Sequence, residues 1–399
     1  MGRQIQDAYI VAAVRTPVAR RNGAFLHVRP DDMLAHVLRA VVAKAPGLDP
    51  ADVGDVIAGC AMPEAEQGMN VARIAALLAG LPETVPGVTV NRFCASGLQA
   101  VADAANRIRL GEAEVMIAAG TESMSAMPQI MGNKVSLNPE IFARRENLGI
   151  AFGMGLTAEK VAEQWQVSRA DQDVFALESH RRACAAIAAG AFVDEIAPYL
   201  VKDFLPGEGG TVRIAERLIR HDEGPRPDAS LEGLAKLKPV FAARGSVTAG
   251  NSSQMSDGAA AVLLMSEAAL KRSGARPIAR FAGYAVAGVP PRVMGIGPVE
   301  AIPRALKLAG VAQDALDWIE LNEAFAAQAL AVIRQLGLDP AKVNPLGGAV
   351  ALGHPLGATG AIRTATLMAA MQRDSMLRHG MISMCIGTGM GAAGVFERV

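Results

Sequence analysis

The chain has 399 residues, of which 51% are hydrophobic but only 4% aromatic, and its 39 basic and 39 acidic side chains leave no net charge. This length suits two or three domains, and the balanced charge argues against a nucleic-acid or anionic-membrane partner. The 41 glycines beside many alanines favour small-residue helices packed on sheets, as in an α/β enzyme, over a β-sandwich.

Short apolar runs alternate with helical patterns in the first third of the chain, the rhythm of βαβ units around a mostly parallel sheet. These predicted elements are 9–14, 31–45, 56–60, 69–81, 88–90, 95–110 and 115–119. The last third repeats the rhythm in 277–287, 302–309, 319–321, 324–336, 358–371 and 381–386. A weak echo of Val90-Asn91 at Val343-Asn344, each followed by a small-residue helix and a strand, fits two similar halves.

The segment from Met124 to Arg244 differs in character from both flanks. Charged helices are predicted at 157–166 and 168–190, and the Gly- and Pro-bearing stretch 205–228 is predicted to be irregular. An insertion of this kind after a strand is where substrate specificity is often built, although a solvated surface is the default for most of its charges.

The cysteines have different settings. Cys94 lies between a short strand and a helix, where unpaired N–H groups and the helix dipole favour a nucleophilic thiolate, although an inert core thiol fits the same position. Cys385 closes an apolar strand and enters the Gly-rich turn 386–391, whose N–H groups are placed to hold an oxyanion. Cys60 and Cys184 lack such settings, which favours structural roles.

Three further polar features stand beside loops. His354 follows a Gly-rich turn and precedes a stiffening proline, so it suits a base or hydrogen-bond donor, or a structural histidine. Asn322, taken alone, is best interpreted as a helix cap. The cluster 251–258 (Asn-Ser-Ser-Gln-Met-Ser-Asp-Gly) is either a turn or a grip on a polar ligand.

Five motifs together resemble those of the thiolase family, in the family's order and over nearly the entire chain. They are 91–97, 251–258, 322–325 (Asn-Glu-Ala-Phe), 353–355 (Gly-His-Pro) and 385–391, and segments 154–159 and 234–239 add to them. The resemblance implies an α/β thiolase fold of two similar βαβαβαββ halves with mixed sheets in a five-layered αβαβα arrangement. The implied domains are 1–123 completed by about 245–272, a loop domain at 124–244 over the coenzyme A site, and 273–399.

The same resemblance assigns roles to the motif residues. Cys94 is implied to be the acylated nucleophile, His354 the group that activates it, and Cys385 the acid/base for the second substrate. Asn322 is implied to hold a water that forms one oxyanion hole with His354, and the N–H groups of Cys94 and Gly387 form the other. Thiolysis of a 3-ketoacyl-CoA, or its reverse Claisen condensation, needs both thiols and both holes.

The resemblance also implies the ligands and partners. Coenzyme A and acyl-CoA thioesters are expected as substrates, with Arg226 and Ser253 at positions that contact coenzyme A, and with no permanent cofactor or metal. A homodimer or homotetramer is implied, and a complex with other β-oxidation enzymes stays open. The apolar run 8–14 is too short for a signal peptide, no stretch reaches about 18 apolar residues, and 397–399 is no peroxisomal address, so we expect a cytoplasmic protein.

Departures from the family pattern favour one subclass. Many short-chain biosynthetic members have histidine where this chain has Gly153, and the final turn reads Gly-Thr-Gly at 387–389. Together with 251–253, these features favour a degradative 3-ketoacyl-CoA thiolase over a biosynthetic acetoacetyl-CoA thiolase. Other condensing enzymes replace the second cysteine, and non-catalytic lipid-binding relatives lose the nucleophile or the Asn-Glu-Ala-Phe motif, whereas this chain keeps all of them.

Overall fold

The computed structural model describes residues 5–126 and 136–399, so residues 127–135 of the predicted loop domain lie outside the described part. The α-helices are α1 Pro30–Ala43, α2 Val71–Leu78, α3 Ser96–Arg109, α4 Met154–Gln164, α5 Arg169–Ala188, α6 Leu231–Ala235, α7 Glu267–Ser273, α8 Gly297–Ala309, α9 Ala326–Leu336, α10 Ala349–Leu352 and α11 Thr359–Arg373. The strands are β1 Tyr9–Arg15, β2 Ala19–Arg20, β3 Val53–Gly59, β4 Gly87–Val90, β5 Val115–Ser123, β6 Tyr199–Pro206, β7 Val212–Ile219, β8 Ser256–Met265, β9 Ala279–Gly288, β10 Trp318–Leu321, β11 His379–Ile386 and β12 Met390–Arg398.

One continuous 10-stranded sheet contains the strands of both halves. Its order is β4-β3-β5-β8-β1 in the first half and β9-β12-β11-β10 in the second, and β1 joins β9 through Tyr9 opposite Arg280 and Ile10 opposite Ala279. An isolated parallel bridge from Ile319 to Val343 occupies the place that β4 has in the first half. The second half therefore repeats the strand order of the first.

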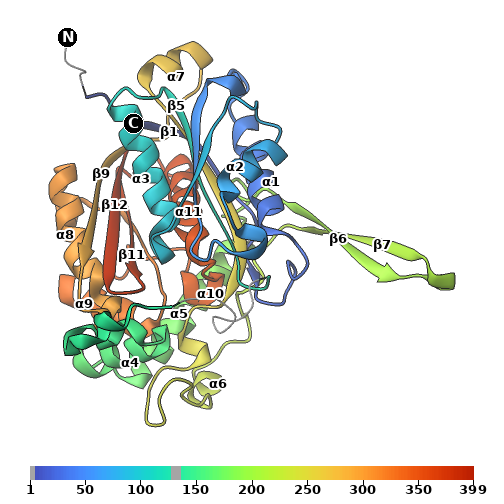
Figure 1. Cartoon of the computed structure of the whole chain (residues 1–399). Coiled ribbons are helices and arrows are strands. Elements are labelled where there is room, and N and C mark those ends of the chain that lie inside the picture. The colour runs from blue at the N-terminus through green and yellow to red at the C-terminus, as the bar shows by residue number, and fades with distance from the viewer. Residues whose placement is uncertain (1–4, 127–135) are drawn as a thin grey trace.

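Helices cover and separate the two parts of the sheet (Figure 1). α1 and α2 pack on the outer face of the first half, α8 on the outer face of the second, and α3 and α11 lie between the halves. α11 is buried on nearly all sides, as expected of a small-residue helix enclosed between sheets. A side chain at Gly360 would lie 2.1 Å from the backbone nitrogen of Leu98, so glycine permits the close approach of α11 to α3. The expected αβαβα layering is present.

The inserted segment leaves the first half after β5 and returns at β8. Its helices α4, α5 and α6 gather at one end of the layers, the end opposite the chain termini (Figure 1). In the second half the corresponding strands β11 and β12 are joined by the short turn 387–389.

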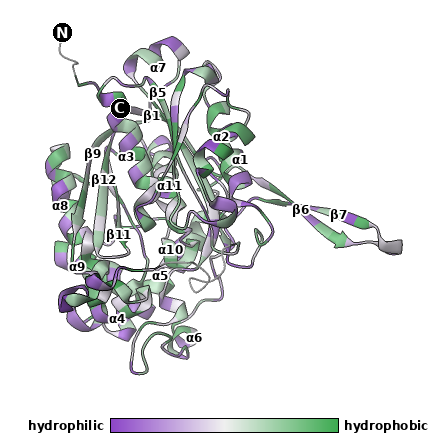
Figure 2. Cartoon of the chain, in the orientation of Figure 1, coloured by the Kyte–Doolittle hydropathy of each residue, from purple (hydrophilic) through white to green (hydrophobic). Residues whose placement is uncertain are grey.

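The prediction that 205–228 is irregular is wrong for its first part. β6 and β7 form an antiparallel hairpin that projects from the body as an arm (Figure 1), and apolar residues occur along both of its strands (Figure 2). Cross-strand pairs on one face are Leu200–Leu218, Phe204–Ile214 and Pro206–Val212. The missed signal is the Gly-rich turn 207–210 between two runs with alternating apolar residues.

Candidate active site

The backbone presents Cys94 on a tight turn between β4 and α3. Cys94 belongs to the 3-10 turn Phe93–Ala95, and α3 begins at Ser96. Phe93 has the left-handed φ of 44°, unusual for a residue with a side chain, and its N–H donates to Asn91 Oδ1 at 2.8 Å. Such strain is concentrated at functional sites, and here the turn leaves Cys94 with a small exposed fraction of 8%.

Burial makes Cys94 a thiol in the resting site. It raises the pKa of Cys94 to about 11, and the opposing backbone N–H groups of Gly387 and of Cys94 itself do not offset it. The prediction of a thiolate stabilised by the helix N-terminus is therefore wrong, because desolvation outweighs the N–H groups. The same two N–H groups are the predicted members of one oxyanion hole, and they converge on the sulfur of Cys94.

The second thiol lies close to the first. Cys385 is fully buried near the end of β11, and its pKa is raised well above 9.0 by burial and then by Cys94. Gly387 and Thr388 follow it in the turn before β12, where Thr388 has a φ of 69°. A side chain at Gly387 would lie 3.6 Å from the sulfur of Met154, so the first residue of α4 borders the two thiols.

His354 is held by a loop that requires glycine before it. Gly353 has a φ of 93°, and a side chain there would lie 2.4 Å from Ser256 Oγ. The ring contacts Thr359 Oγ1 through Nδ1 at 2.6 Å and Asn322 Nδ2 through Nε2 at 3.2 Å. Thr359 Oγ1 also donates to the Pro355 carbonyl at 3.2 Å, so the tautomer with a proton on Nδ1 satisfies all these contacts and leaves a lone pair on Nε2.

The environment of His354 keeps the ring neutral. Burial, followed by the nearby Arg363 guanidinium, lowers the pKa of His354 to about 3. A neutral imidazole with its lone pair on Nε2 can accept a proton from a thiol during attack on a carbonyl carbon, in exchange for the hydrogen bond from Asn322 Nδ2.

Asn322 does not cap the helix that follows it, so the interpretation of this residue as a cap is wrong. α9 begins at Ala326 with Phe325 as its N-cap residue, and the Asn322 side chain instead contacts His354. Asn322 is buried, and its Oδ1 has no hydrogen-bond partner among the residues that the structure describes. An unpaired buried amide oxygen of this kind is a natural acceptor for a water or a substrate group.

Two buried carboxylates fix the loops around the site: Glu122, which belongs to none of the predicted motifs, and Glu323, which belongs to the motif 322–325 but has no role assigned from the sequence. Glu122, at the end of β5, accepts hydrogen bonds from the backbone of Ala61 at 2.8 Å and of Gly357 at 2.9 Å. Glu323 accepts from Ser179 Oγ at 2.7 Å and from the Val350 N–H at 3.1 Å. Both carboxylates therefore hold the two sides of the loop that carries His354.

A cavity of about 300 Å³ lies beside the inserted helices. Its lining residues are His180, Arg226, Asp228, Ala229, Ser230, Gly233, Leu234, Leu237, Ala249, Gly250, Gln254 and Val350. Arg226 is one of these lining residues, and its backbone N–H donates to His180 Nδ1 at 3.2 Å. Ser253 is not among the lining residues; its N–H donates to the Ala324 carbonyl at 3.0 Å.

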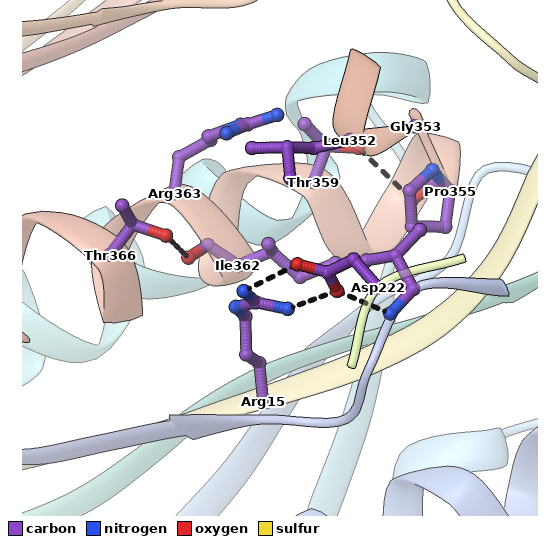
Figure 3. Close-up of a pocket in the computed structure, with 10 residues that line it drawn as sticks. Arg15, Asp222, Leu352, Gly353, Pro355, Thr359, Ile362, Arg363 and Thr366 are labelled. Carbon is purple, nitrogen blue, oxygen red and sulfur yellow. Dashed lines mark hydrogen bonds and ion pairs between the residues drawn. The ribbon is translucent and has the colours of Figure 1, made fainter. Parts of the chain in front are cut away.

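The segment that leads to Arg226 is anchored by a buried ionic cluster (Figure 3). Asp222 accepts a forked pair of hydrogen bonds from Arg15 at 2.7 and 2.9 Å and another from the Val18 N–H at 2.8 Å. Arg15 Nε also donates to Glu195 Oε1 at 2.6 Å. Within 5–126 and 136–399, no group of three or more His, Cys, Asp or Glu side chains is placed to hold a metal ion.

Comparison with known proteins identifies the family. The sequence profile described as "Thiolase, N-terminal domain" matches residues 8–268, and "Thiolase, C-terminal domain" matches residues 275–398. The chain belongs to the thiolase family. The predicted α/β thiolase fold is thereby confirmed, and this thiolase is an acyltransferase.

Relatives resemble this thiolase over its full length. It is 49% identical to the "3-ketoacyl-CoA thiolase" of Bacillus subtilis (strain 168), over 98% of this chain and 100% of the relative. The crystal structure of the Bacillus anthracis acetyl-CoA acetyltransferase has a TM-score of 0.89 at 40% identity and covers 100% of both chains. Human mitochondrial 3-ketoacyl-CoA thiolase has a TM-score of 0.87 at 37% identity and covers 99% of both.

Proposed function

We propose that this thiolase cleaves 3-ketoacyl-CoA with coenzyme A through an acyl-Cys94 intermediate, and that it catalyses the reverse Claisen condensation. The observation that carries the proposal is the convergence on Cys94 of two backbone N–H groups and a second buried thiol, Cys385. The contact between His354 and Asn322 adds a neutral base and an unpaired amide oxygen. Coenzyme A is a substrate in this scheme, and no permanent cofactor takes part.

The proposed cycle moves two protons. Cys94 attacks the 3-keto carbon while its thiol proton passes to His354 Nε2, and the bond between C2 and C3 breaks. Cys385 protonates C2 of the departing acetyl-CoA enolate and becomes a thiolate. Coenzyme A then attacks the acyl-Cys94 thioester, its thiol proton returns to Cys385, and His354 returns the first proton to the Cys94 sulfur. The products are acetyl-CoA and an acyl-CoA shortened by two carbons.

Negative charge develops on carbonyl oxygens in both steps, and each oxygen needs a donor set. For the acyl thioester on Cys94, we assign the backbone N–H groups of Cys94 and Gly387. For the enolate, we assign His354 together with a water held by Asn322, whose unpaired Oδ1 supports this role. Neither assignment needs a metal ion.

Thiolysis assays with single-cysteine variants test the mechanism. Cys94→Ala and Cys385→Ala should each abolish cleavage of every 3-ketoacyl-CoA in a chain-length series. Cys184→Ala is the matched control, because this free thiol is partly exposed on α5 and should be dispensable. Full activity of the Cys94→Ala protein would refute the acyl-cysteine mechanism, and failure of the wild type on the whole series would favour a non-catalytic lipid-binding role.

The loop domain, residues 124–244, is proposed to cover the coenzyme A site. Arg226 on the wall of the 300 Å³ cavity supports this assignment, since an arginine suits a phosphate group. Ser253 is proposed as a second contact, from the cavity's neighbouring segment. Calorimetric titration with coenzyme A should show weaker binding for Arg226→Ala, and unchanged affinity in that variant would remove Arg226 from the site.

A degradative substrate range is favoured over an acetoacetyl-CoA specialist. A side chain at Gly153 would meet no atom within 4 Å, and the neighbouring Met154 borders Gly387. Gly153 is exposed and carries no side chain beside Met154, which supports acceptance of acyl chains longer than acetoacetyl. A marked preference for acetoacetyl-CoA alone would support the biosynthetic alternative instead.

We further propose a homodimer or a homotetramer built from dimers. β4 is an edge strand with Val88 40% exposed, and α2 beside it exposes Leu77 and Leu78. The arm exposes Phe204 and Ile214 on one face, and an isolated hairpin with such a face gains stability when a second copy covers it. Sedimentation analysis distinguishes these assemblies from a monomer.

The cytoplasm is the proposed cellular setting, and other enzymes of β-oxidation are the proposed partners. All four cysteines are free, which supports a reducing compartment. Across residues 5–126 and 136–399, no helix combines the length and apolar character that a bilayer span requires. Localisation of the tagged protein in its native cell, followed by co-purification, tests both proposals.

A further inference from the structure

One glutamine side chain connects the wall of the coenzyme A cavity to the histidine loop. The amide nitrogen of Gln254 lies 2.9 Å from the carbonyl oxygen of Gly224, 3.1 Å from that of Ala351 and 3.3 Å from that of Val350. Gly224 belongs to the segment between Asp222 and Arg226, whereas Val350 and Ala351 belong to α10. This NH₂ group therefore bridges the segment 222–226 and helix α10.

The main chain of the same residue holds the histidine directly. The N–H of His354 donates to the Gln254 carbonyl at 3.2 Å and to Ser256 Oγ at 3.2 Å. Ser256 Oγ donates to the same Gln254 carbonyl at 2.9 Å. Gln254 thus contacts α10 through its side chain and His354 through its carbonyl, and it helps to position the imidazole.

The two loops are packed so closely that movement of one displaces the other. A side chain at Gly224 would lie 2.3 Å from the Ala351 carbonyl oxygen and 2.9 Å from the Gln254 amide. Asp222, two residues earlier, is fixed to β1 by the fork from Arg15 (Figure 3). Gln254 and Val350 also line the cavity that contains Arg226.

We infer that Gln254 is a positioning residue that ties the coenzyme A-binding segment to the alignment of His354. The inference rests on the proposed function and deepens it. An apolar side chain at position 254 leaves three carbonyl oxygens without their shared donor, so both loops relax together. The expected result is a joint loss of coenzyme A affinity and of proton transfer from Cys94.

The test uses Gln254→Met, which keeps length and volume without the amide, and Gln254→Glu, which keeps shape. Two measurements avoid turnover: calorimetric affinity for coenzyme A, and the rate of Cys94 alkylation by iodoacetamide, located by mass spectrometry. In Gln254→Met we expect both to fall about tenfold, because small misplacements of reacting groups have effects of this order. The control is Gln313→Met. It removes a hydrogen bond of 2.8 Å from the side-chain amide to the Leu336 carbonyl, which is remote from the site.

Gln254→Glu separates positioning from general destabilisation. Its carboxylate repels the three carbonyl oxygens, but its protonated form regains one donor, so its alkylation rate relative to wild type should rise as the pH falls from 8 to 5.5. A merely structural role would lower the melting temperature without this pH signature.

The outcomes are distinguishable from failure of the proposed function. Wild-type affinity and alkylation rate in Gln254→Met, or losses no larger than those of Gln313→Met, would overturn the role of Gln254. Loss of affinity without loss of alkylation rate would also overturn it, since coupling requires both. Activity retained in Cys94→Ala would instead refute the acyl-cysteine mechanism and leave the affinity and alkylation results for Gln254 standing.

Discussion

Replacing Thr359 by valine tests whether a single hydroxyl sets the tautomer of His354. Valine matches threonine in shape, so the loop and α11 should keep their packing. The change removes the oxygen that lies 2.6 Å from His354 Nδ1 and leaves the Nδ1 proton buried without an acceptor. The ring can then place its proton on Nε2 if the Asn322 amide turns its unpaired Oδ1 toward it, and in that tautomer Nε2 can no longer accept the proton of a thiol.

The size of the effect follows from the cost of an unpaired buried donor. That cost is about 1 to 3 kcal/mol, and each 1.4 kcal/mol is about tenfold in an equilibrium constant, so the ratio of the competent to the other tautomer should decrease by roughly 5- to 140-fold. The rate constant kcat for thiolysis should fall by the same factor. Thr359→Ser should restore most of the activity, because serine keeps the hydroxyl.

The assay is steady-state thiolysis together with side-chain ¹⁵N spectra of the imidazoles, which distinguish the two tautomers. Thr364→Val is the matched control. This buried residue of the same helix donates a hydrogen bond of 2.8 Å to the Gly360 carbonyl and none to His354. A Thr359→Val enzyme within about twofold of wild type, well below the cost of one unpaired donor, would refute the reasoning.

Three further predictions concern specificity, pH and assembly. Gly153→His should lower kcat/KM for long 3-ketoacyl-CoA relative to acetoacetyl-CoA by about tenfold, because the imidazole is added next to Met154, which borders Gly387; an unchanged ratio in the chain-length series would contradict it. Burial raises the pKa of Glu320 to about 7 from 4.5, so the folded state holds its proton more tightly than the unfolded chain and loses stability as pH rises through this window. The loss in the free energy of unfolding is about 3 kcal/mol between pH 4.5 and 7. Glu320→Gln should remove this pH dependence when unfolding by urea is measured; a pH dependence equal to that of wild type would show that another group causes it. Phe204→Ser combined with Ile214→Ser should reduce the assembly size measured by light scattering while thiolysis persists; an unchanged size would leave the arm without a partner.

Local periodicity predicted most of the elements, but the expectation of a mostly parallel sheet is wrong. Among the described strands the pairs β3–β4, β3–β5 and β10–β11 are parallel, whereas β5–β8, β8–β1, β1–β9, β9–β12 and β12–β11 are antiparallel. The strands β8 and β12, which were not predicted, run back against their neighbours. Apolar runs and small-residue helices gave β1, β3, β5 and their counterparts in the second half near their observed bounds, because burial between layers selects these patterns. The arm was missed since its apolar residues are exposed and separated by charges, which is typical of a loop as well as of a hairpin. The sequence similarity between 90–91 and 343–344 predicts a second copy of β4, but the structure has only an isolated bridge at Val343 in its place.

The sequence predicts which residues form the site but not their protonation states or their contacts. The helix N-terminus favours a thiolate at Cys94 but burial opposes it, and no local sequence pattern indicates how deeply a thiol will be buried. Asn322 stands before a helix, where a cap is expected, and its actual partner His354 is 32 positions away, so no local pattern indicates the contact. Glu122 and Gly357 are 235 positions apart, so the carboxylates that fix the loops become visible only when the halves are assembled.

The central position of β1 has a consequence for synthesis on the ribosome. This strand is made first, yet its hydrogen-bonded neighbours are β8 and β9, so it must wait for residues 256–265 and 279–288 to emerge. α3, also made early, buries apolar side chains against α11 and the last strands. A nascent chain that ends near residue 268 therefore exposes one whole side of its helical middle layer, and such intermediates are prone to aggregation. We expect productive folding of this enzyme to be largely post-translational and sensitive to chaperone supply.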